Sequence, residues 1–251
     1  MRDYKYSSVI LWLLTGGVLS IIFNAIMKKM GVHAGDYEIF PTFISWIINY
    51  IICAGLIKNR MGSYGDYFSN IKTINLKVFL MNIFIGLITF AIYMLFLVVT
   101  VGGVNKSIND ENVTRYLVGF IPFIVVYTII SLIFAYSNFI LADEKYRDLG
   151  FFETFSFITK TGFGLIGKTF KTILSTFKIP LIVIIAASII GLATANKMPI
   201  TSIGLFPIIM IAIVACFFMA PNYLAKISNI YLDKFGSIRL NESVENSEIW
   251  F

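Results

Sequence analysis

Two phosphate-binding patterns overlap in the stretch TGFGLIGKT, residues 161–169. The pattern G-x-x-x-x-G-K-[ST] runs from Gly162 to Thr169 and includes Lys168. In nucleotide-binding proteins the backbone N–H groups of such a loop surround the phosphates, and the lysine reaches the terminal phosphates. The dinucleotide-binding pattern G-x-G-x-x-G runs from Gly162 to Gly167. Taken alone, these residues would suggest that the chain binds ATP or a dinucleotide.

Phosphate binding of this kind requires elements that the sequence does not predict. A P-loop follows a buried strand of a parallel sheet and opens a helix, and a second strand supplies an acidic metal ligand. The longest stretch between predicted membrane spans, Asp143–Lys178, has about 36 residues, which is too short for an α/β nucleotide domain. The residues before Gly162, FFETFSFITK, do not have the pattern of a strand. We therefore expect no nucleotide and no other cofactor.

The composition predicts a membrane protein. Hydrophobic residues make up 58% of the chain and charged residues only 14%, whereas a typical soluble domain has about 25% charged residues. A helix needs about 20 apolar residues to span the hydrocarbon core. Six segments qualify, at residues 8–27, 39–57, 78–104, 117–142, 179–195 and 203–232. The prediction is an all-α, polytopic membrane helix bundle, with one transmembrane domain over residues 1–232 and a cytoplasmic polar tail over 233–251.

The distribution of lysine and arginine predicts the orientation of the chain. Fifteen of these residues fall at the termini and in the second and fourth loops, and five fall on the other side. Because basic residues accumulate on the cytoplasmic side, both termini are expected in the cytoplasm of a cell with a plasma (inner) membrane. We expect the first span to be retained, since Lys28 and Lys29 follow it and no small-residue cleavage site does. The net charge of +6 is then a topology signal and an attraction to anionic lipid, not a sign of nucleic-acid binding.

An amphipathic helix is predicted over residues 151–178, before the fifth span. At 100° per residue, six apolar residues between Phe163 and Phe177 fall within an arc of about 100°. The lysines fall within a second arc of about 80°; they are Lys160, Lys168, Lys171 and Lys178. Such a helix lies in the membrane interface and turns its lysines toward anionic headgroups or a protein partner. The glycines at 162, 164 and 167 would weaken it by roughly 1 kcal/mol each, and they allow a bend or the close approach of another helix.

Ionisable side chains are absent from the middle of every predicted span. Proton relays and ion pumps need such groups, so proton-coupled transport is disfavoured. The loop residues His33, Asp36 and Glu38 are interpreted as solvated, and no metal site is predicted. Cys53 and Cys216 fall inside predicted spans and are interpreted as packed apolar residues, not as a disulfide or a redox pair.

Polar residues near the cytoplasmic ends of the spans could line a cavity open to the cytoplasm. The candidates for this cargo cavity are Asn82, Tyr136, Asn138, Asn222 and Tyr223. The alternative interpretation is that polar and small residues make helix–helix contacts, as they commonly do in lipid. Pro221 precedes Asn222 and is either a functional break, which frees a carbonyl for a cargo, or a kink that fits the packing.

The segment FILADEKYRDLGFFETFSFITKTG, Phe139–Gly162, resembles a cytoplasmic segment of the membrane-domain relatives of glycerophosphodiester phosphodiesterases, a group of bacterial six-helix proteins. In that group a span ends in an apolar–acidic stretch, followed by Gly-aromatic-aromatic-Glu-Ala and an amphipathic helix. The match here runs from Gly150 to Glu153, while Thr154 stands where alanine is usual and Ile158 where a small hydroxyl residue is common. The resemblance implies an all-helical membrane bundle without the catalytic phosphodiesterase domain.

These observations favour an integral membrane transport component that is not an enzyme. We expect a permease-type or accessory subunit that handles an amphiphilic cargo such as a peptide or a lipid. If ATP drives the transport, a separate ATPase subunit would dock on the cytoplasmic loops. The alternative is a membrane-embedded binding, immunity or assembly-scaffold protein for a membrane-active partner.

Overall fold

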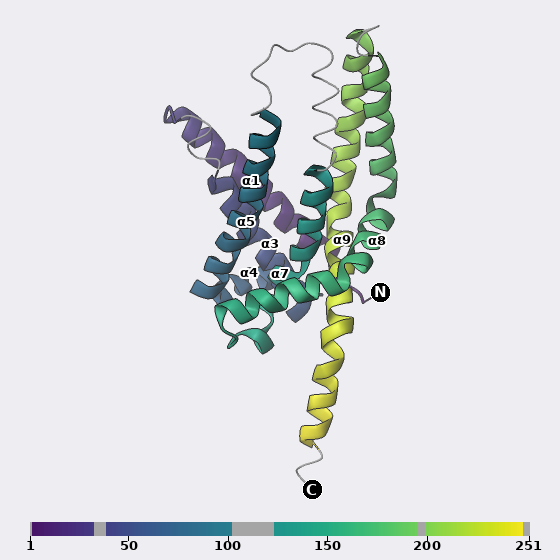
Figure 1. Ribbon diagram of the computed structural model, residues 1–251. Helices are drawn as coiled ribbons and strands as arrows, with labels where there is room; N and C mark the ends of the chain where they lie inside the picture. Colours follow the sequence, from purple (N-terminus) through teal and green to yellow (C-terminus); the bar gives the residue numbers. More distant parts are fainter. Residues whose placement is uncertain (1, 33–38, 102–122, 195–198, 248–251) are drawn as a thin grey trace. The chain divides into compact units, whose positions relative to one another are not determined.

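The computed structural model describes residues 2–32, 39–101, 123–194 and 199–247, and every regular element in these ranges is helical (Figure 1). The α-helices are α1 (Tyr6–Lys29), α3 (Ile39–Lys58), α4 (Tyr64–Phe68), α5 (Leu76–Val101), α7 (Ser137–Ala142), α8 (Phe151–Thr194) and α9 (Pro199–Ser247). Short 3₁₀ helices lie at Ser69–Thr73 (η1), Phe134–Tyr136 (η2) and Glu144–Tyr146 (η3). Residues 123–133 are also helical and lead directly into η2.

Six helices of the described residues are long and apolar enough to cross a membrane. They are Tyr6–Lys29, Phe40–Lys58, Leu76–Leu95, Phe123–Ala142, Phe151–Ala187 and Phe206–Gly236. Within hydrocarbon a helix satisfies its own backbone hydrogen-bonding groups, so apolar sequences of this length fold as spanning helices. The predicted fold class, an all-helical membrane bundle, is thereby confirmed.

Two predicted boundaries differ from the structure. The predicted interfacial helix, 151–178, and residues 179–194 of the predicted fifth span, 179–195, belong to the single helix α8, which continues through Pro180; residue 195 lies outside the described residues. Proline removes only one backbone N–H donor, and such losses are tolerated in apolar helices. The helix α9 likewise continues beyond residue 232 to Ser247, so much of the predicted polar tail is helical. The ends of the third and fourth predicted spans, 102–104 and 117–122, lie outside the described residues.

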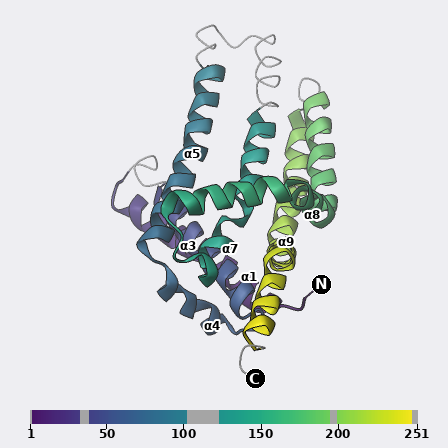
Figure 2. The ribbon, with the colours of Figure 1, turned by 60° about the horizontal axis from the view of Figure 1, so that its bottom comes forward.

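The first of two compact units contains Met1–Ser69 and Lys168–Phe251. In this unit α1 packs against α3, α4 and α9, and the ring of Trp12 stacks on that of Tyr64 with centroids 4.4 Å apart. The later part of α8 runs beside α9 in both views (Figures 1 and 2). There the rings of Phe177 and Tyr223 lie 5.6 Å apart. Aromatic and aliphatic packing therefore holds the helices of this unit together.

The second compact unit contains Asn70–Gly167. It comprises α5, the fourth span with η2 and α7, the η3 segment and the beginning of α8. The ring of Phe84 in α5 packs edge-on against Phe151 and Phe155 of α8, at 5.7 and 5.1 Å between centroids. The fourth span ends at Asp143, whose backbone is extended. This unit therefore brings the start of α8 against two spanning helices.

Candidate functional site

The phosphate-binding patterns lie in the interior of α8, where they form no loop. Backbone N–H groups inside an α-helix bond to carbonyls four residues earlier, so they are not available to surround a phosphate. A Cβ added at Gly162 would lie only 1.9 Å from the carbonyl oxygen of Ile133, whereas one at Gly167 meets nothing within 4 Å. The side chain of Thr169 is fully buried. Gly162 therefore serves the close approach of α8 to the fourth span, one of the roles predicted for these glycines.

Three sectors run along residues 152–178 of α8. The buried sector is rich in threonine and contains Thr154, Ile158, Thr161, Leu165, Thr169, Thr172 and Thr176. At 100° per residue this sector covers about 80° of the helix. A narrow exposed sector of about 40° carries Phe152, Phe163, Phe170 and Leu174. The third sector carries the lysines. Thr161 and Thr172 lie next to the lysines in helical spacing, but the structure buries both threonines.

All four predicted lipid-contacting lysines are exposed, and they lie along the third sector of α8. They are Lys160, Lys168, Lys171 and Lys178. The aromatic and lysine sectors are both exposed, and they are neighbours in helical spacing. This is the arrangement of a helix that lies in the membrane interface, with aromatics in the acyl boundary and cations toward headgroups. Contact of these lysines with anionic lipid or a partner remains a prediction.

A rigid segment, residues 143–150, precedes α8 in the second unit. Lys77 Nζ donates to the carbonyls of Tyr146, Arg147 and Leu149, at 3.0, 2.7 and 3.0 Å. The ring of Tyr146 lies 4.4 Å from that of Phe157 in α8. Three carbonyls held by one ammonium group fix this segment against the start of α8, since charge-assisted hydrogen bonds are stronger than neutral ones.

The first turn of α8 carries a side-chain cap. The carboxylate Oε2 of Glu153 accepts a hydrogen bond from the backbone N–H of Gly150 at 2.9 Å. Thr154 donates from its hydroxyl to the carbonyl of Gly150, also at 2.9 Å. Glutamate in the third helical position is a common way to satisfy the donor that precedes a helix. The cap fixes where α8 begins.

A groove lies over this segment and the first turns of α8. Its volume is about 470 Å³, within the range of roughly 300–1,000 Å³ typical of ligand sites. It is lined by Leu149, Phe152, Glu153, Ser156, Phe157 and Lys160. Apolar and charged side chains therefore meet in one hollow at the predicted membrane interface.

Three of the predicted cavity residues belong to the second unit. Asn82 is half-buried and donates from its amide to the carbonyl of Val78, one turn earlier in α5, at 3.0 Å. Tyr136 is fully buried, and Asn138 is 6% exposed. The side-chain oxygen of Asn138 is buried and accepts no hydrogen bond among the described residues. A buried amide oxygen without a donor is costly, commonly by about 1–3 kcal/mol, and such atoms are rare.

The other two predicted cavity residues, Asn222 and Tyr223, belong to the first unit. Asn222 follows Pro221 inside the continuous helix α9 and accepts a hydrogen bond from the hydroxyl of Tyr4. Tyr223 packs its ring against Phe177 of α8. The five predicted residues thus fall into two groups, each with contacts inside its own unit. That all five line one cavity remains a prediction.

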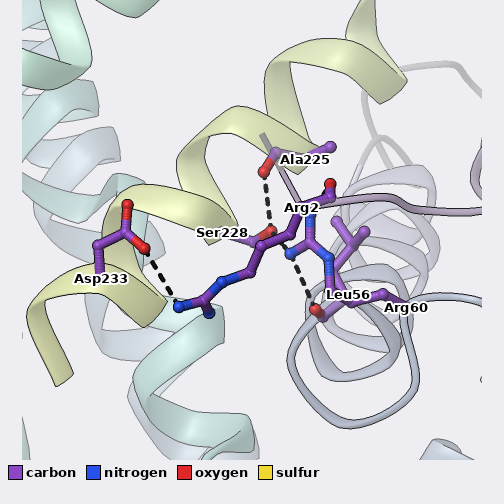
Figure 3. A network of polar contacts seen from close by, with 6 residues as sticks. All are labelled: Arg2, Leu56, Arg60, Ala225, Ser228 and Asp233. Carbon is purple, nitrogen blue, oxygen red and sulfur yellow. Dashed lines mark hydrogen bonds and ion pairs between the residues drawn. The ribbon is translucent and has the colours of Figure 1, made fainter. Parts of the chain in front are cut away.

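Sequence reasoning missed a polar network around Arg60, which follows α3 (Figure 3). The Arg60 guanidinium donates to the carbonyls of Leu56, Asp3 and Arg2 at 3.2–3.3 Å and to the hydroxyl of Ser228. Burial lowers the pKa of Arg60, although an arginine stays charged at ordinary pH. The hydrogen bonds to carbonyl oxygens offset the cost of burying that charge.

The N-terminal segment is attached to α9 by further contacts of the same network. Arg2 pairs with Asp233 at 3.2 Å (Figure 3), and the hydroxyl of Tyr6 donates to the carbonyl of Phe218 at 2.8 Å. The carbonyl of Arg60 accepts from the hydroxyl of Tyr67 at 3.3 Å, and burial raises the pKa of Tyr67 to about 12. Arg60 and Ser228 are 168 positions apart, so no local sequence signal connects them.

The described residues contain no group of three or more His, Cys, Asp and Glu that could hold a metal ion. The loop residues His33, Asp36 and Glu38 lie outside the described ranges.

Taken together, the six apolar helices define a multi-pass membrane protein. Comparison with protein-family models, with curated proteins and with solved structures finds no match. Function is therefore inferred from the geometry of this chain alone.

Proposed function

We propose that this protein is a transport component of the plasma membrane, a permease-type or accessory subunit that handles an amphiphilic peptide or lipid. The observation that carries the proposal is the interruption of the fourth span beside Asn138. The α-helix changes to a 3₁₀ turn at Phe134–Tyr136, and the side-chain oxygen of Asn138 is buried without a donor. Discontinuous spanning helices with unsatisfied polar groups are typical of cargo sites in transporters.

The surroundings of Asn138 favour an amphiphilic cargo over an ion. Its neighbours Phe139, Ile140 and Leu141 are buried and apolar, and one amide oxygen offers a single acceptor. A cargo that donates one hydrogen bond and is otherwise apolar would satisfy this site without a charged partner. Ion coordination requires several oxygen ligands, and the carboxylate nearest in sequence, Asp143, accepts a hydrogen bond from the N–H of Lys145.

The proposed role requires no enzymatic chemistry in this chain. Energy for directed transport would come from a separate ATPase subunit, for which the exposed basic side chains of the loops offer a docking charge. The proposal includes the orientation with both termini in the cytoplasm.

The test isolates the chain and everything that copurifies with it in a mild detergent, then reconstitutes the assembly in vesicles. The assay measures, with and without ATP, the transfer of two fluorescent probes across the vesicle membrane. One probe is a phospholipid and the other is an apolar peptide. The variant Asn138→Leu should lose transfer while its thermal stability stays equal or rises, because an unsatisfied polar group has been removed. Loss of transfer without loss of stability distinguishes a cargo contact from a structural residue.

A matched control is Thr89→Val in α5 of the same unit. The hydroxyl of Thr89 already bonds to the carbonyl of Ile85 in its own helix at 3.0 Å, so transfer should be unchanged. The transport proposal is wrong if the wild-type assembly transfers neither probe and a stable protein partner without ATPase activity copurifies. That result would favour the binding, immunity or scaffold role.

A further inference from the structure

We propose that the groove at the start of α8 binds one phospholipid whose headgroup carries both a phosphate and a primary ammonium group, as in phosphatidylethanolamine. The inference rests on the proposed function only in placing the protein in a lipid membrane, and it expects this part of α8 at the membrane interface. It assigns a defined lipid site to one surface of the second unit. The groove is the one lined by Leu149, Phe152, Glu153, Ser156, Phe157 and Lys160.

The apolar part of the groove matches the upper part of an acyl chain. Phe152 is 77% exposed, and Leu149 and Phe157 lie beside it in the lining. A phenyl ring left this open to water is unfavourable, since burial of a large apolar side chain is stabilising. In the interface the same ring would be covered by lipid.

The polar part of the groove carries one charge of each sign. Lys160 is exposed, and its ammonium group forms no ion pair among the described residues. Ser156 lies one turn before Lys160, so their side chains occupy the same helical row. A hydroxyl and an ammonium group in one row are suitable donors for a phosphate.

Glu153 supplies the opposite charge at the other end of the lining. One of its oxygens, Oε2, accepts the N–H of Gly150, and this bond holds the side chain at the start of α8. The carboxylate can still accept hydrogen bonds, because each of its oxygens has two lone pairs. An ammonium group donates such bonds, whereas a choline group has no N–H to donate. A purely anionic headgroup would instead be repelled by Glu153.

The walls of the groove are fixed before a lipid arrives. Lys77 holds the carbonyls of Tyr146, Arg147 and Leu149, and Tyr146 packs on Phe157. A preformed site loses less conformational entropy on binding than a mobile one. This rigidity separates the groove from the other exposed lysines of α8, which present single charges to the headgroup layer.

The test measures binding of single phospholipids to the purified full-length protein in detergent by native mass spectrometry. The probes are phosphatidylethanolamine, phosphatidylcholine and phosphatidylglycerol with the same acyl chains, and inorganic phosphate as a competitor. The wild type should bind phosphatidylethanolamine about tenfold more tightly than the other two, a ratio that corresponds to about 1.4 kcal/mol. Inorganic phosphate at millimolar concentration should not displace it.

Two variants test the contributions of Glu153 and Lys160 to lipid binding one at a time. Glu153→Gln keeps an oxygen that can accept from Gly150 and therefore keeps the helix cap, but it should remove the preference for phosphatidylethanolamine over phosphatidylglycerol. Lys160→Gln should weaken all three phospholipids by about tenfold, as expected for the loss of a charge-assisted hydrogen bond. Lys72→Gln removes an exposed lysine of the same unit that lies outside the groove lining and outside α8, and it should change binding less than twofold.

Equal binding of the three lipids, or tightest binding of phosphatidylglycerol, would overturn the inference. Equal effects of the Lys160 and Lys72 variants would overturn it as well, because they would indicate general attraction to charge. Displacement by inorganic phosphate would reassign the groove to free phosphate, and a copurifying protein that blocks lipid binding would reassign it to that partner. The Asn138→Leu variant should bind lipid normally. Failure of the transport proposal can therefore be distinguished from failure of the proposed lipid site.

Discussion

Replacement of Gly162 by alanine should destabilise the protein, whereas the same change at Gly167 should not. A Cβ at Gly162 would lie 1.9 Å from the oxygen and 2.6 Å from the carbonyl carbon of Ile133, against an ordinary contact of 3.4–4 Å. The two backbones would have to separate by about 1.5 Å to restore that contact. Overpacking typically costs about 1–3 kcal/mol, and the upper value applies because a backbone cannot rotate away as a side chain can.

Helix propensity acts in the opposite direction at both positions. Alanine is favoured over glycine in a helix by about 1 kcal/mol, so the net loss at Gly162 is about 2 kcal/mol. At Gly167, where an added Cβ meets nothing within 4 Å, a gain of up to about 1 kcal/mol is expected. The two variants should then differ by about 3 kcal/mol, or roughly a hundredfold in the unfolding equilibrium constant.

The assay is reversible unfolding in mixed detergent micelles, followed by far-ultraviolet circular dichroism of the helices. A third variant, Gly162→Ala combined with Ile133→Ala, should not recover stability, since the obstructing atoms belong to the backbone of Ile133. Equal stability of the Gly162 and Gly167 variants would refute the close approach of α8 to the fourth span. It would also remove the structural explanation for the glycine that begins both phosphate-binding patterns.

Three further results are expected in the first unit. Arg60→Lys should lower the free energy of unfolding by about 1–3 kcal/mol, measured by thermal denaturation in detergent, because lysine cannot donate to several acceptors in the geometry of the guanidinium fork. Gly55→Ala should lower the melting temperature, since its Cβ would lie 2.3 Å from the ring of Tyr67; an unchanged melting temperature would contradict that packing. Ser63 and Asp66 cap the start of α4, and hydrogen bonds from Ser63 lower the pKa of Asp66. The stabilisation from this helix cap should therefore be complete above about pH 4 and be lost as the pH falls further. Melting temperatures of the wild type and Asp66→Asn should therefore converge in acid.

The spanning helices could be predicted from the sequence because their signal is local. An uninterrupted apolar run of about 20 residues has few folded alternatives in lipid. The lysine row of α8 could be predicted for the same reason, since it depends only on helical spacing. The threonine sector could not, because threonine is compatible with both a buried and a solvated face. Only the packing of neighbouring helices decides that Thr161 and Thr169 are buried.

The residues of the candidate site show the same difference between properties that follow from local sequence and properties that depend on packing. Asn138 was predicted as a polar residue near the end of a span, but its missing hydrogen-bond donor depends on everything packed around it. Lys77 was counted in the sequence as a topology signal, and it also holds three carbonyls of residues 146–149. Arg60 was counted in the same way, although its partners include Ser228 at a separation of 168 positions. The number of lysine and arginine residues gives the charge of a segment, but it does not show which carbonyl oxygens accept hydrogen bonds from these side chains.

The length of α8 supports an interfacial position for its first half. At 1.5 Å per residue its 44 residues extend about 66 Å, about twice the thickness of the hydrocarbon core. Residues 179–194 carry no charge, whereas Lys160, Lys168, Lys171 and Lys178 all precede them. Burying four lysines at the centre of a bilayer would cost several kcal/mol, so the uncharged second half is the part that enters the hydrocarbon. We therefore expect the first half to stay in the interface, with its aromatic sector against acyl chains and its lysine sector toward headgroups, while its threonine sector is buried.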